Sequence, residues 1–267
     1  MPNCSALVFD LDGTLLRRDR SVSTSNLQAL LQAASVGFTL VIATSRPIRS
    51  IRQFLPSALL DLCTTISLNG AAIWSPGAGN ARLLGHVGAD LTPLLDALSA
   101  TSHDLRYSLE TDGQRFALSH PLDAHDLWTV HAATPDMVVH EGLIDPIQVT
   151  KIAVDGLGRA LDEALGLARG FPALRFIPAD AQTFLNIVPA DVDKAPALGM
   201  VADELGLDLS ASIAFGDDLP DLDLMSVVGT GIAMSNGHEL VHAAADQVIG
   251  DCDEDTIADW IHRNLLS

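Results

Sequence analysis

Short apolar runs alternate with longer amphipathic stretches in the first third of the chain. The short runs contain little polar alternation, and the longer stretches carry apolar residues at helical spacing. We expect strands over residues 6–9, 38–43 and 64–68 and helices over residues 23–36 and 47–55. Strands that are apolar on both faces are typical of a parallel sheet covered by helices on both sides. The pattern therefore predicts an α/β fold built on a doubly wound parallel sheet.

The C-terminal third of the chain repeats this rhythm. We expect strands over residues 212–215 and 231–234, helices over residues 195–205 and 222–227, and further helices from His238 and Thr256. Because both ends of the chain alternate strands and helices in the same way, they are predicted to form one Rossmann-like domain. This domain should comprise residues 1–72 and 187–267.

The middle of the chain, residues 73–186, has a different pattern. Hairpin-like pieces and short strands mix with helical stretches and do not alternate regularly with them. The expected strands are residues 71–74, 83–87, 116–119, 152–154, 174–177 and 184–188, and the expected helices are residues 91–100 and 157–169. This segment is predicted to be an inserted α+β domain.

Acidic residues outnumber basic residues by 34 to 15, which gives a formal net charge of −19. Lysine and arginine form no clustered basic stripe, so neither nucleic acid nor an anionic membrane is an expected partner. No uncharged run approaches the roughly 18 residues of a membrane span, and we see no secretory signal. Three cysteines far apart in sequence fit neither a disulfide framework nor a zinc site. We expect a cytoplasmic protein that is a monomer or a small homo-oligomer.

Polar side chains follow three of the predicted strands at the point where each strand ends. Asp10 and Asp12 follow the first strand, the segment 44–46 follows the second, and Asp217 and Asp221 follow the strand over 212–215. Ligands of doubly wound sheets bind beyond the carboxyl ends of the strands. If these strands are neighbours, the four aspartates lie close together.

Several carboxylates that share one site require a positive counter-charge, because like charges raise one another's pKa. Magnesium fits best, since it prefers oxygen ligands and is commonly held by one or two carboxylates together with a phosphate. The alternative interpretation is that Asp12 belongs to a simple turn with Gly13 and that Asp217, Asp218 and Asp221 form a solvated loop and helix start.

Two basic residues lie at predicted helix starts. Lys194 is one of only two lysines, the other being Lys151, and it follows Asp193, a candidate N-cap. Arg46 immediately precedes Pro47 in the same kind of position. Two cations at helix N-termini form a suitable phosphate cradle, although a solvated lysine beside an aspartate is an equally simple interpretation of Lys194. With the carboxylates, the cradle predicts attack of one carboxylate on phosphorus, while a second carboxylate transfers protons.

Four segments of the chain resemble the motifs of the haloacid dehalogenase (HAD) superfamily of phosphohydrolases. Motif one is similar to residues 10–14, DLDGT, motif two to Thr44, motif three to Lys194 and motif four to residues 216–221. The segments SLNGAAI and GIAMSNG are similar to the Cof-type branch, which carries an α/β cap between motifs two and three. The insertion at 73–186 has the position and size of that cap.

The resemblance implies a role for each of these residues. Asp10 would be the nucleophile and a magnesium ligand, and Asp12 would be the general acid and base and would offer its backbone carbonyl to the metal. Asp217 would bind the metal directly, and Asp221 would do so through water or as a supporting residue. Thr44 and Lys194 would hold the phosphoryl group, with Ser45 and Arg46 beside them.

Two residues depart from the usual Cof-type pattern. Pro220 replaces an asparagine of motif four, which removes an amide near the metal, although proline is tolerated in the first turn of a helix. Ser45 replaces a glycine of motif two, and we expect it to cap the following helix. Asn236 lies after a strand at the same edge, where either a supporting role or a turn role fits.

The sequence thus predicts a magnesium-dependent phosphatase that hydrolyses a small phosphorylated metabolite, a sugar phosphate or a similar compound, under a closing cap. Two alternatives remain. A phosphosugar mutase would share the core, the cap position and the aspartyl phosphate, and would return the phosphoryl group to its substrate. A phosphometabolite-binding or regulatory protein with a weakened site would bind ligand without releasing phosphate.

Overall fold

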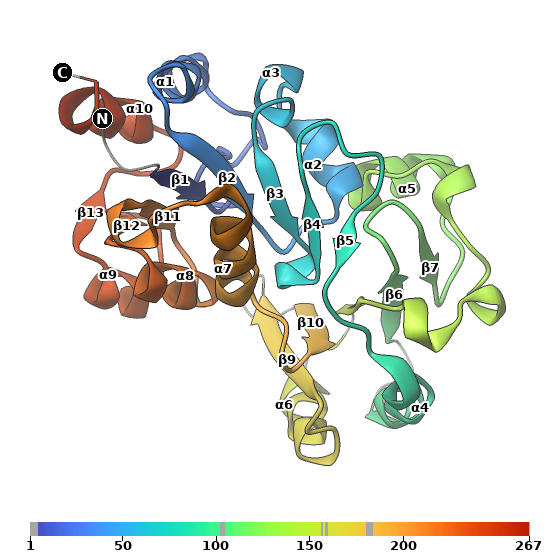
Figure 1. The fold of residues 1–267 in the computed structure, drawn as a ribbon. Helices are drawn as coiled ribbons and strands as arrows, with labels where there is room; N and C mark the ends of the chain where they lie inside the picture. The colour runs from blue at the N-terminus through green and yellow to red at the C-terminus, as the bar shows by residue number, and fades with distance from the viewer. Residues whose placement is uncertain (1–4, 102–104, 156, 158–159, 180–183, 267) are drawn as a thin grey trace.

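The computed structural model describes residues 5–101, 105–155, 157, 160–179 and 184–266. Its larger sheet has the strand order β13-β12-β11-β1-β2-β3-β4-β5 (Figure 1). The strands are β1 (Ala6–Phe9), β2 (Thr39–Ala43), β3 (Thr64–Ser67), β4 (Ala72–Trp74), β5 (Arg82–Leu83), β11 (Ile213–Gly216), β12 (Thr230–Met234) and β13 (Gln247–Ile249). The pairs from β13 to β3 are parallel, and β4 and β5 are antiparallel. The predicted parallel sheet is therefore present, with β1 near its centre.

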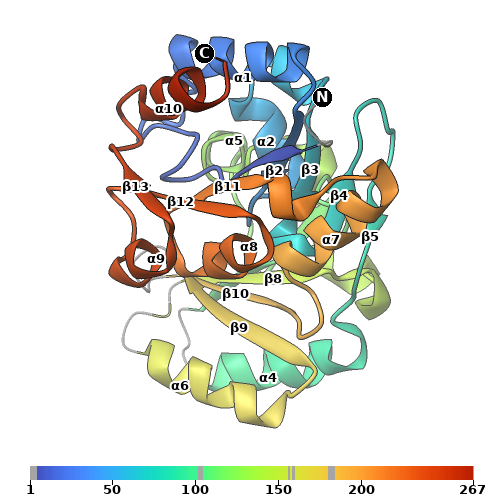
Figure 2. The same cartoon turned by 60° about the vertical axis from the view of Figure 1, so that its left-hand side comes forward.

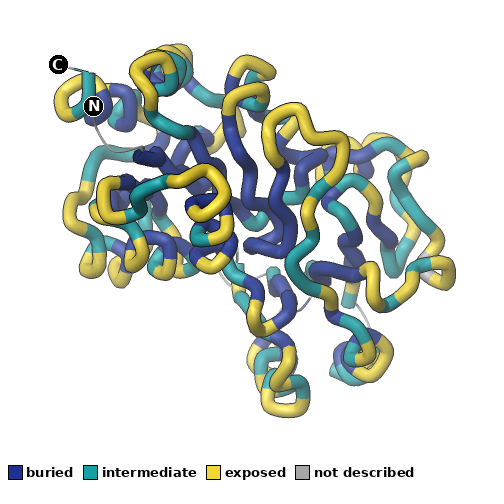
Figure 3. The backbone as a smooth tube through the Cα atoms, viewed as in Figure 1, coloured by how far each residue is buried: buried dark blue, intermediate teal, exposed yellow. Residues whose placement is uncertain are grey.

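Helices cover both faces of this sheet, as the apolar strands require. On one face lie α1 (Thr24–Ser35), α2 (Ile48–Phe54), α3 (Ser57–Leu60) and α10 (Thr256–Asn264), and on the other lie α7 (Lys194–Leu205), α8 (Leu222–Val227) and α9 (Glu239–Ala244). Phe9 and Phe215 stack in the core at a ring-centroid distance of 4.8 Å, with Trp260 of α10 edge-on to Phe215. Figure 3 shows the central strands as buried tubes between more exposed helices.

The smaller sheet is antiparallel and has the order β7-β6-β8-β10-β9. Its strands are β6 (Arg106–Glu110), β7 (Phe116–Leu118), β8 (Lys151–Asp155), β9 (Leu174–Ala179) and β10 (Phe184–Pro189). Helices α4 (Leu91–Thr101) and α6 (Leu161–Gly166) pack on one face of the sheet, and α5 (Ala124–His131) follows β7. The opposite face points toward the larger sheet (Figure 2). This unit is the predicted α+β insertion, and we refer to it as the cap.

The hairpin expected at the start of the insertion pairs with the larger sheet. β4 lies antiparallel to β3, and β5 lies antiparallel to β4. The domain boundary at residue 73 stays a prediction, and this pairing favours a boundary that follows β5.

Two 3-10 helices lie beside the carboxyl ends of the parallel strands, η1 (Leu68–Gly70) after β3 and η9 (Leu219–Asp221) after β11. Ser23 caps α1 by accepting a hydrogen bond from the N–H of Asn26 at 3.0 Å.

The helix expected over residues 157–169 falls partly outside the described residues and is otherwise replaced by α6 and a 3-10 turn. Within the described ranges, no helix combines the length and apolar character needed to cross a membrane.

Candidate active site

Strand pairing brings together acids from opposite ends of the chain. Asp10 follows β1 and has 7% of its surface exposed, and its N–H donates to the carbonyl of Phe215 in β11 at 3.0 Å. Asp217 and Asp221 follow β11. One carboxylate oxygen of each of the three acids lies within 4.8 Å of those of the other two. Of the four aspartates expected to converge, Asp10, Asp217 and Asp221 do so. The expectation is wrong for the Asp12 carboxylate, which lies outside this group and pairs with Arg46.

The loop after Asp10 is shaped to pass directly over Asp217. Gly13 has a φ of +77°, and a Cβ on it would lie 2.2 Å from Asp217 Oδ2, so a side chain at this position is excluded. The Thr14 hydroxyl donates to Asp217 Oδ1 at 2.7 Å. Asn236 donates through Nδ2 to the Gly13 carbonyl at 2.8 Å and accepts at Oδ1 from the N–H of Cys252 at 2.8 Å. Asn236 therefore supports the loop that holds the candidate nucleophile.

Lys194 connects two of the three acids. It is the first residue of α7, and the side chain of Asp193 caps this helix by accepting from the Lys194 N–H at 2.6 Å, as expected. The ammonium of Lys194 donates to Asp10 Oδ1 at 2.6 Å and to Asp221 Oδ1 at 2.7 Å. Asp221 Oδ2 accepts from the N–H groups of Asp217 and Asp218 at 3.0 and 3.2 Å. Both oxygens of Asp221 are thus engaged in holding the cluster.

The electrostatics of the cluster follow from burial. Burial raises the pKa of Asp10 well above its usual range, against the opposing effect of Lys194, and Asp221 and Asp217 raise it further. Burial and the neighbouring Asp221 raise the pKa of Asp217 to about 7. Burial lowers the pKa of Lys194, but Asp10 and Asp221 outweigh it, so this pKa is raised. Three carboxyl groups share a single ammonium, which leaves the cluster short of positive charge.

The donor set fits a hard divalent cation. In the described part of the chain, the carboxylates of Asp10 and Asp217 use Oδ1 for their hydrogen bonds, so Oδ2 of each can serve as a ligand. Asp221 uses both oxygens and is placed to orient Lys194 and the backbone of the loop. Several carboxylate oxygens within 4.8 Å of one another are suitable ligands for magnesium. The arrangement favours Asp10 and Asp217 as direct ligands and Asp221 as their support.

Asp12 lies at the mouth of the site and pairs with Arg46. The guanidinium donates through Nε and Nη2 to the two carboxylate oxygens of Asp12, at 2.6 Å each, and through Nη1 to the Ser50 hydroxyl at 2.8 Å. It also lies over the Phe54 ring, 4.8 Å from the centroid. The Asp12 side chain is 48% exposed, so water and a leaving group can both reach it. Arg46 therefore orients the expected acid and base.

The segment after β2 only partly matches the expectation that Thr44, Ser45 and Arg46 bind phosphate. Ser45 and Arg46 line the cavity described below, whereas Thr44 is buried and is absent from its lining. The Thr44 hydroxyl accepts from the N–H of Arg46 at 3.2 Å. The expectation that Ser45 caps the next helix is wrong, because Pro47 occupies the N-cap position of α2 and makes no side-chain cap. The phosphate-binding role of Thr44 stays a prediction.

Pro220 lies within η9, where its missing N–H costs no helical hydrogen bond. Asp218 and Asp221 form a capping box around this short helix. The expected survival of the backbone at Pro220 is therefore confirmed. Pro220 also lines the cavity, so it presents an apolar ring where an asparagine would present an amide.

A cavity of about 1060 Å³ separates the carboxylate cluster from the cap sheet. The strands of the cap alternate, so that Leu109, Ile152, Val154, Leu185 and Ile187 pack under its helices and the residues between them face the cavity. The cavity-facing residues of the cap sheet are Ser108, Glu110, Lys151, Ala153, Asp155, Ile177, Ala179, Phe184 and Asn186. The volume suits a small metabolite.

Sequence reasoning assigned no role to several of these cap residues. The sequence pattern did not predict strand β6, which carries Ser108 and Glu110. Glu110 forms a buried ion pair with Arg49 of α2, through two hydrogen bonds of 2.6 Å, which joins the cap to the core. Thr14 is part of the DLDGT motif, but its bond to Asp217 was not anticipated. Only Lys151 had a visible signal, because the chain has just two lysines.

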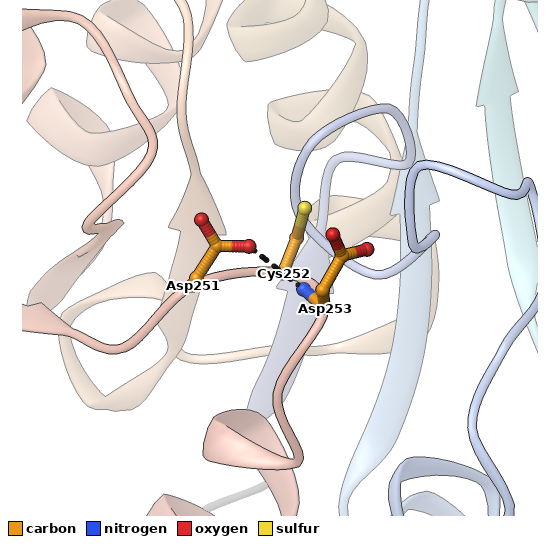
Figure 4. Close-up of side chains that lie close together, drawn as sticks. All are labelled: Asp251, Cys252 and Asp253. Carbon is orange, nitrogen blue, oxygen red and sulfur yellow. Dashed lines mark hydrogen bonds between the residues drawn. The ribbon is translucent and has the colours of Figure 1, made fainter.

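A second group of candidate metal ligands, shown in Figure 4, is absent from the lining of the cavity. Asp251, Cys252 and Asp253 offer ligand atoms within 4.8 Å of one another, and the N–H of Asp253 donates to Asp251 Oδ1 at 2.9 Å. Arg18 forms ion pairs with both aspartates, so each of them already has a cationic partner. An aspartate of this group is therefore a suitable control for the buried cluster.

Two kinds of comparison with known proteins agree with this geometry. Residues 7–261 match the family model described as haloacid dehalogenase-like hydrolase. An HMP-PP phosphatase of Citrobacter koseri is 30% identical over 271 residues, covering 95% of this chain and 93% of that protein. Pyridoxal phosphate phosphatase YbhA of Escherichia coli is 25% identical over 281 residues, covering 97% and 98%.

Solved structures share the fold. A haloacid dehalogenase-like hydrolase from Bacteroides thetaiotaomicron superposes with a TM-score of 0.83 at 25% identity, covering 97% of this chain and 99% of that one. The Thermotoga maritima protein TM0651 gives a TM-score of 0.79 at 22% identity, with 97% of each chain covered. The match of the family model extends over both the core and the cap. This chain therefore belongs to the haloacid dehalogenase-like hydrolases.

Proposed function

We propose that this protein is a magnesium-dependent phosphatase that hydrolyses a small phosphorylated metabolite. The observation that supports this most is the buried cluster of Asp10, Asp217 and Asp221 around Lys194, which opens on a cavity of metabolite size. The relatives described above are named as phosphatases of small phosphorylated compounds. The substrate itself is left open, because the cap residues that face the cavity identify no single leaving group.

In the first half of the proposed reaction, a carboxylate oxygen of Asp10 attacks phosphorus in line with the leaving oxygen. The bond from phosphorus to that oxygen breaks, and Asp12 donates a proton to the departing alkoxide. Lys194 neutralises charge on the phosphoryl oxygens and keeps Asp10 oriented through the bond at 2.6 Å. A bound magnesium ion would add further positive charge at the same oxygens.

In the second half, water attacks phosphorus of the aspartyl phosphate. Asp12 accepts a proton from this water, the bond between Asp10 and phosphorus breaks, and inorganic phosphate leaves. In the resting structure Arg46 donates to both carboxylate oxygens of Asp12 at 2.6 Å, which positions Asp12 at the mouth of the site for both proton transfers. The Asp10 carboxylate is regenerated for the next cycle.

The direct test is phosphate release from a panel of sugar phosphates and phosphorylated heterocycles, with and without magnesium. Saturable release that requires magnesium supports the proposal. Conversion of one phosphate isomer into another without release would point to a mutase. Thermal shifts with ligand but without release would point to a binding protein.

Magnesium should stabilise the wild-type protein measurably. A ligand present at 100 times its dissociation constant adds about 2.7 kcal/mol to the free energy of unfolding. Replacing Asp217 by asparagine should remove most of this gain, because one of the two available carboxylate ligands is lost. The measurement is thermal unfolding in magnesium and in a chelator. Asp251→Asn is the matched control, because it removes an aspartate that pairs with Arg18 and does not line the cavity; equal loss in both variants would contradict the assignment.

One cap residue bears on the leaving group. Asn186 of β10 has 2% of its surface exposed and lines the cavity, and its Oδ1 has no hydrogen-bond partner among the described residues. It lies opposite Ala153 and Ile177, and Ser108 lies opposite Ala153 on the other side, so the side chains toward β6 are small. A buried carbonyl oxygen without a donor is unfavourable. The row therefore favours substrates whose leaving group presents a hydroxyl or N–H group.

Replacing Asn186 by leucine should lower kcat/KM about tenfold for the best substrate of the panel. Leucine has a similar size and cannot accept a hydrogen bond. Hydrolysis of p-nitrophenyl phosphate, whose leaving group has no donor, should change much less. Steady-state kinetics on both substrates test this, and an equal loss on the two would show that Asn186 has only a structural role.

A further inference from the structure

Lys151 is a buried cation in the cavity wall that the reaction described above does not use. It begins β8 in the cap sheet, has 5% of its surface exposed and lines the cavity. Its ammonium donates to the carbonyl of Ser45 in the core at 2.8 Å. Ser45 is the residue between Thr44 and Arg46, so Lys151 reaches from the cap to the expected phosphate cradle.

Among the described residues, no carboxylate pairs directly with the ammonium of Lys151; Glu110, which lies opposite it in the cap sheet, pairs with Arg49. Among the cationic side chains of the cavity, Lys194 pairs with Asp10 and Asp221, Arg46 pairs with Asp12, and Arg49 pairs with Glu110. Arg20 is exposed to solvent. In the described part of the chain, Lys151 forms no ion pair, and its hydrogen bond is to a neutral carbonyl. A buried ammonium of this kind is costly unless a negative charge joins it.

The charged groups around Lys151 indicate which kind of ligand would stabilise its ammonium. Burial lowers its pKa to about 7, Glu110 opposes this effect, and the positive charges of Arg49, Lys194 and Arg46 lower it further. These cations converge on one volume, which also receives the Asp10 side chain. An anion with several oxygens, placed between the two lysines, would pair with the ammonium of Lys151 in the cap and with that of Lys194 in the core.

We propose that Lys151 is a phosphate-binding residue supplied by the cap, and that its ammonium contacts the phosphoryl group of the substrate beside Ser45. This inference rests on the proposed function, because it assigns the phosphoryl group to the same site. It assigns a second task to the cap besides recognition of the leaving group. The phosphoryl group is held by Lys194 from the core and by Lys151 from the cap, so productive binding requires the cap to lie over the core.

The competing explanation is that Lys151 merely fastens the cap to the core through the Ser45 carbonyl. The two roles predict opposite effects on stability. Methionine at position 151 has a similar length and removes a costly buried charge, so a ligand-binding role predicts a melting temperature at or above that of the wild type without phosphate. A fastening role predicts a lower melting temperature and unchanged affinity for phosphate.

The test measures binding of inorganic phosphate, with magnesium present, by isothermal titration calorimetry. Asp10→Asn is the parent protein, so that no turnover interferes. Adding Lys151→Met should raise the dissociation constant of phosphate at least about tenfold, as expected for loss of a charge-assisted hydrogen bond. Arg52→Met is the matched control, because Arg52 is exposed, bonds Gln114 of the cap at 3.2 Å and lies outside the cavity. It removes the same charge and should leave the dissociation constant within about twofold.

With an active substrate, Lys151→Met should raise KM by a similar factor and more than it lowers kcat. Undiminished phosphate affinity in Lys151→Met overturns the inference, as does equal weakening by Arg52→Met or failure of the parent protein to bind phosphate. If the parent binds phosphate through Lys151 but the wild type releases phosphate from no ester, only the proposed function fails.

Discussion

Replacing Asp10 by asparagine should lower the rate of phosphate release by at least about 10⁴-fold. Removing the nucleophile of a covalent mechanism commonly costs a factor of about 10⁴ to 10⁶ in kcat, and an amide oxygen is a far weaker nucleophile than a carboxylate. The measurement is single-turnover and steady-state phosphate release from the best substrate of the panel. Wild-type rates in this variant would exclude Asp10 as the nucleophile.

The Asp10→Asn variant should remain folded, which makes its loss of activity interpretable. The substituted amide keeps the shape of the side chain, and Lys194 retains its second partner, Asp221, at 2.7 Å. The change also removes a buried carboxyl group whose pKa is raised by burial and by the neighbouring Asp221 and Asp217. Its free energy of unfolding without metal should therefore lie within about 1 kcal/mol of the wild-type value. A denaturant titration of both proteins checks this.

Replacing Lys194 by methionine should have the largest effect on stability. The ammonium is almost fully buried and bonds both Asp10 and Asp221, so its removal leaves two buried carboxyl groups without their counter-charge. Breaking a buried ion pair by removing one partner typically costs about 3–5 kcal/mol. Phosphate release should also be lost, because the phosphoryl oxygens lose a cation.

Denaturant unfolding in the presence of a chelator measures the cost of Lys194→Met without a contribution from metal. The double variant with Asp10→Asn is the informative control, because it removes one of the two stranded charges. It should recover part of the lost stability, and its coupling energy should exceed about 0.5 kcal/mol since the two side chains are in contact. Strict additivity of the two substitutions would show that the ion pair contributes little.

The carboxylate end of the site was accessible from sequence because its geometry is imposed by strand ends. Two of these residues, Asp10 and Asp217, directly follow a strand, and Lys194 is the first residue of a helix. A sequence pattern that predicts the strand or helix therefore also places the residue. The core strands could be recognised for the same reason, since their apolar runs are continuous. β13 was missed because two of its three residues are exposed and it carries no such run.

The cap end of the site could not be derived in the same way. Which cap residues face the cavity depends on the strand register, and a shift of one residue exchanges the two faces of a strand. Glu110 is 61 residues from its partner Arg49, and nothing in the local pattern of either residue indicates the pairing. The bidentate contact of Arg46 with Asp12 likewise joins two residues that were assigned separate tasks. Such side-chain pairings appear only when packing is known.

The pairing of β1 with β11 has a consequence for synthesis of the chain. The N–H of Ala6, at the start of β1, donates to the Ser212 hydroxyl across a sequence separation of 206 residues, whereas all strand pairs of the cap lie between residues 106 and 189. Contacts close in sequence form sooner than distant ones. A chain emerging from the ribosome can therefore complete its cap while β1 still lacks β11. The carboxylate cluster requires Asp217 and Asp221, so it can form only after the strands of the cap have been synthesised.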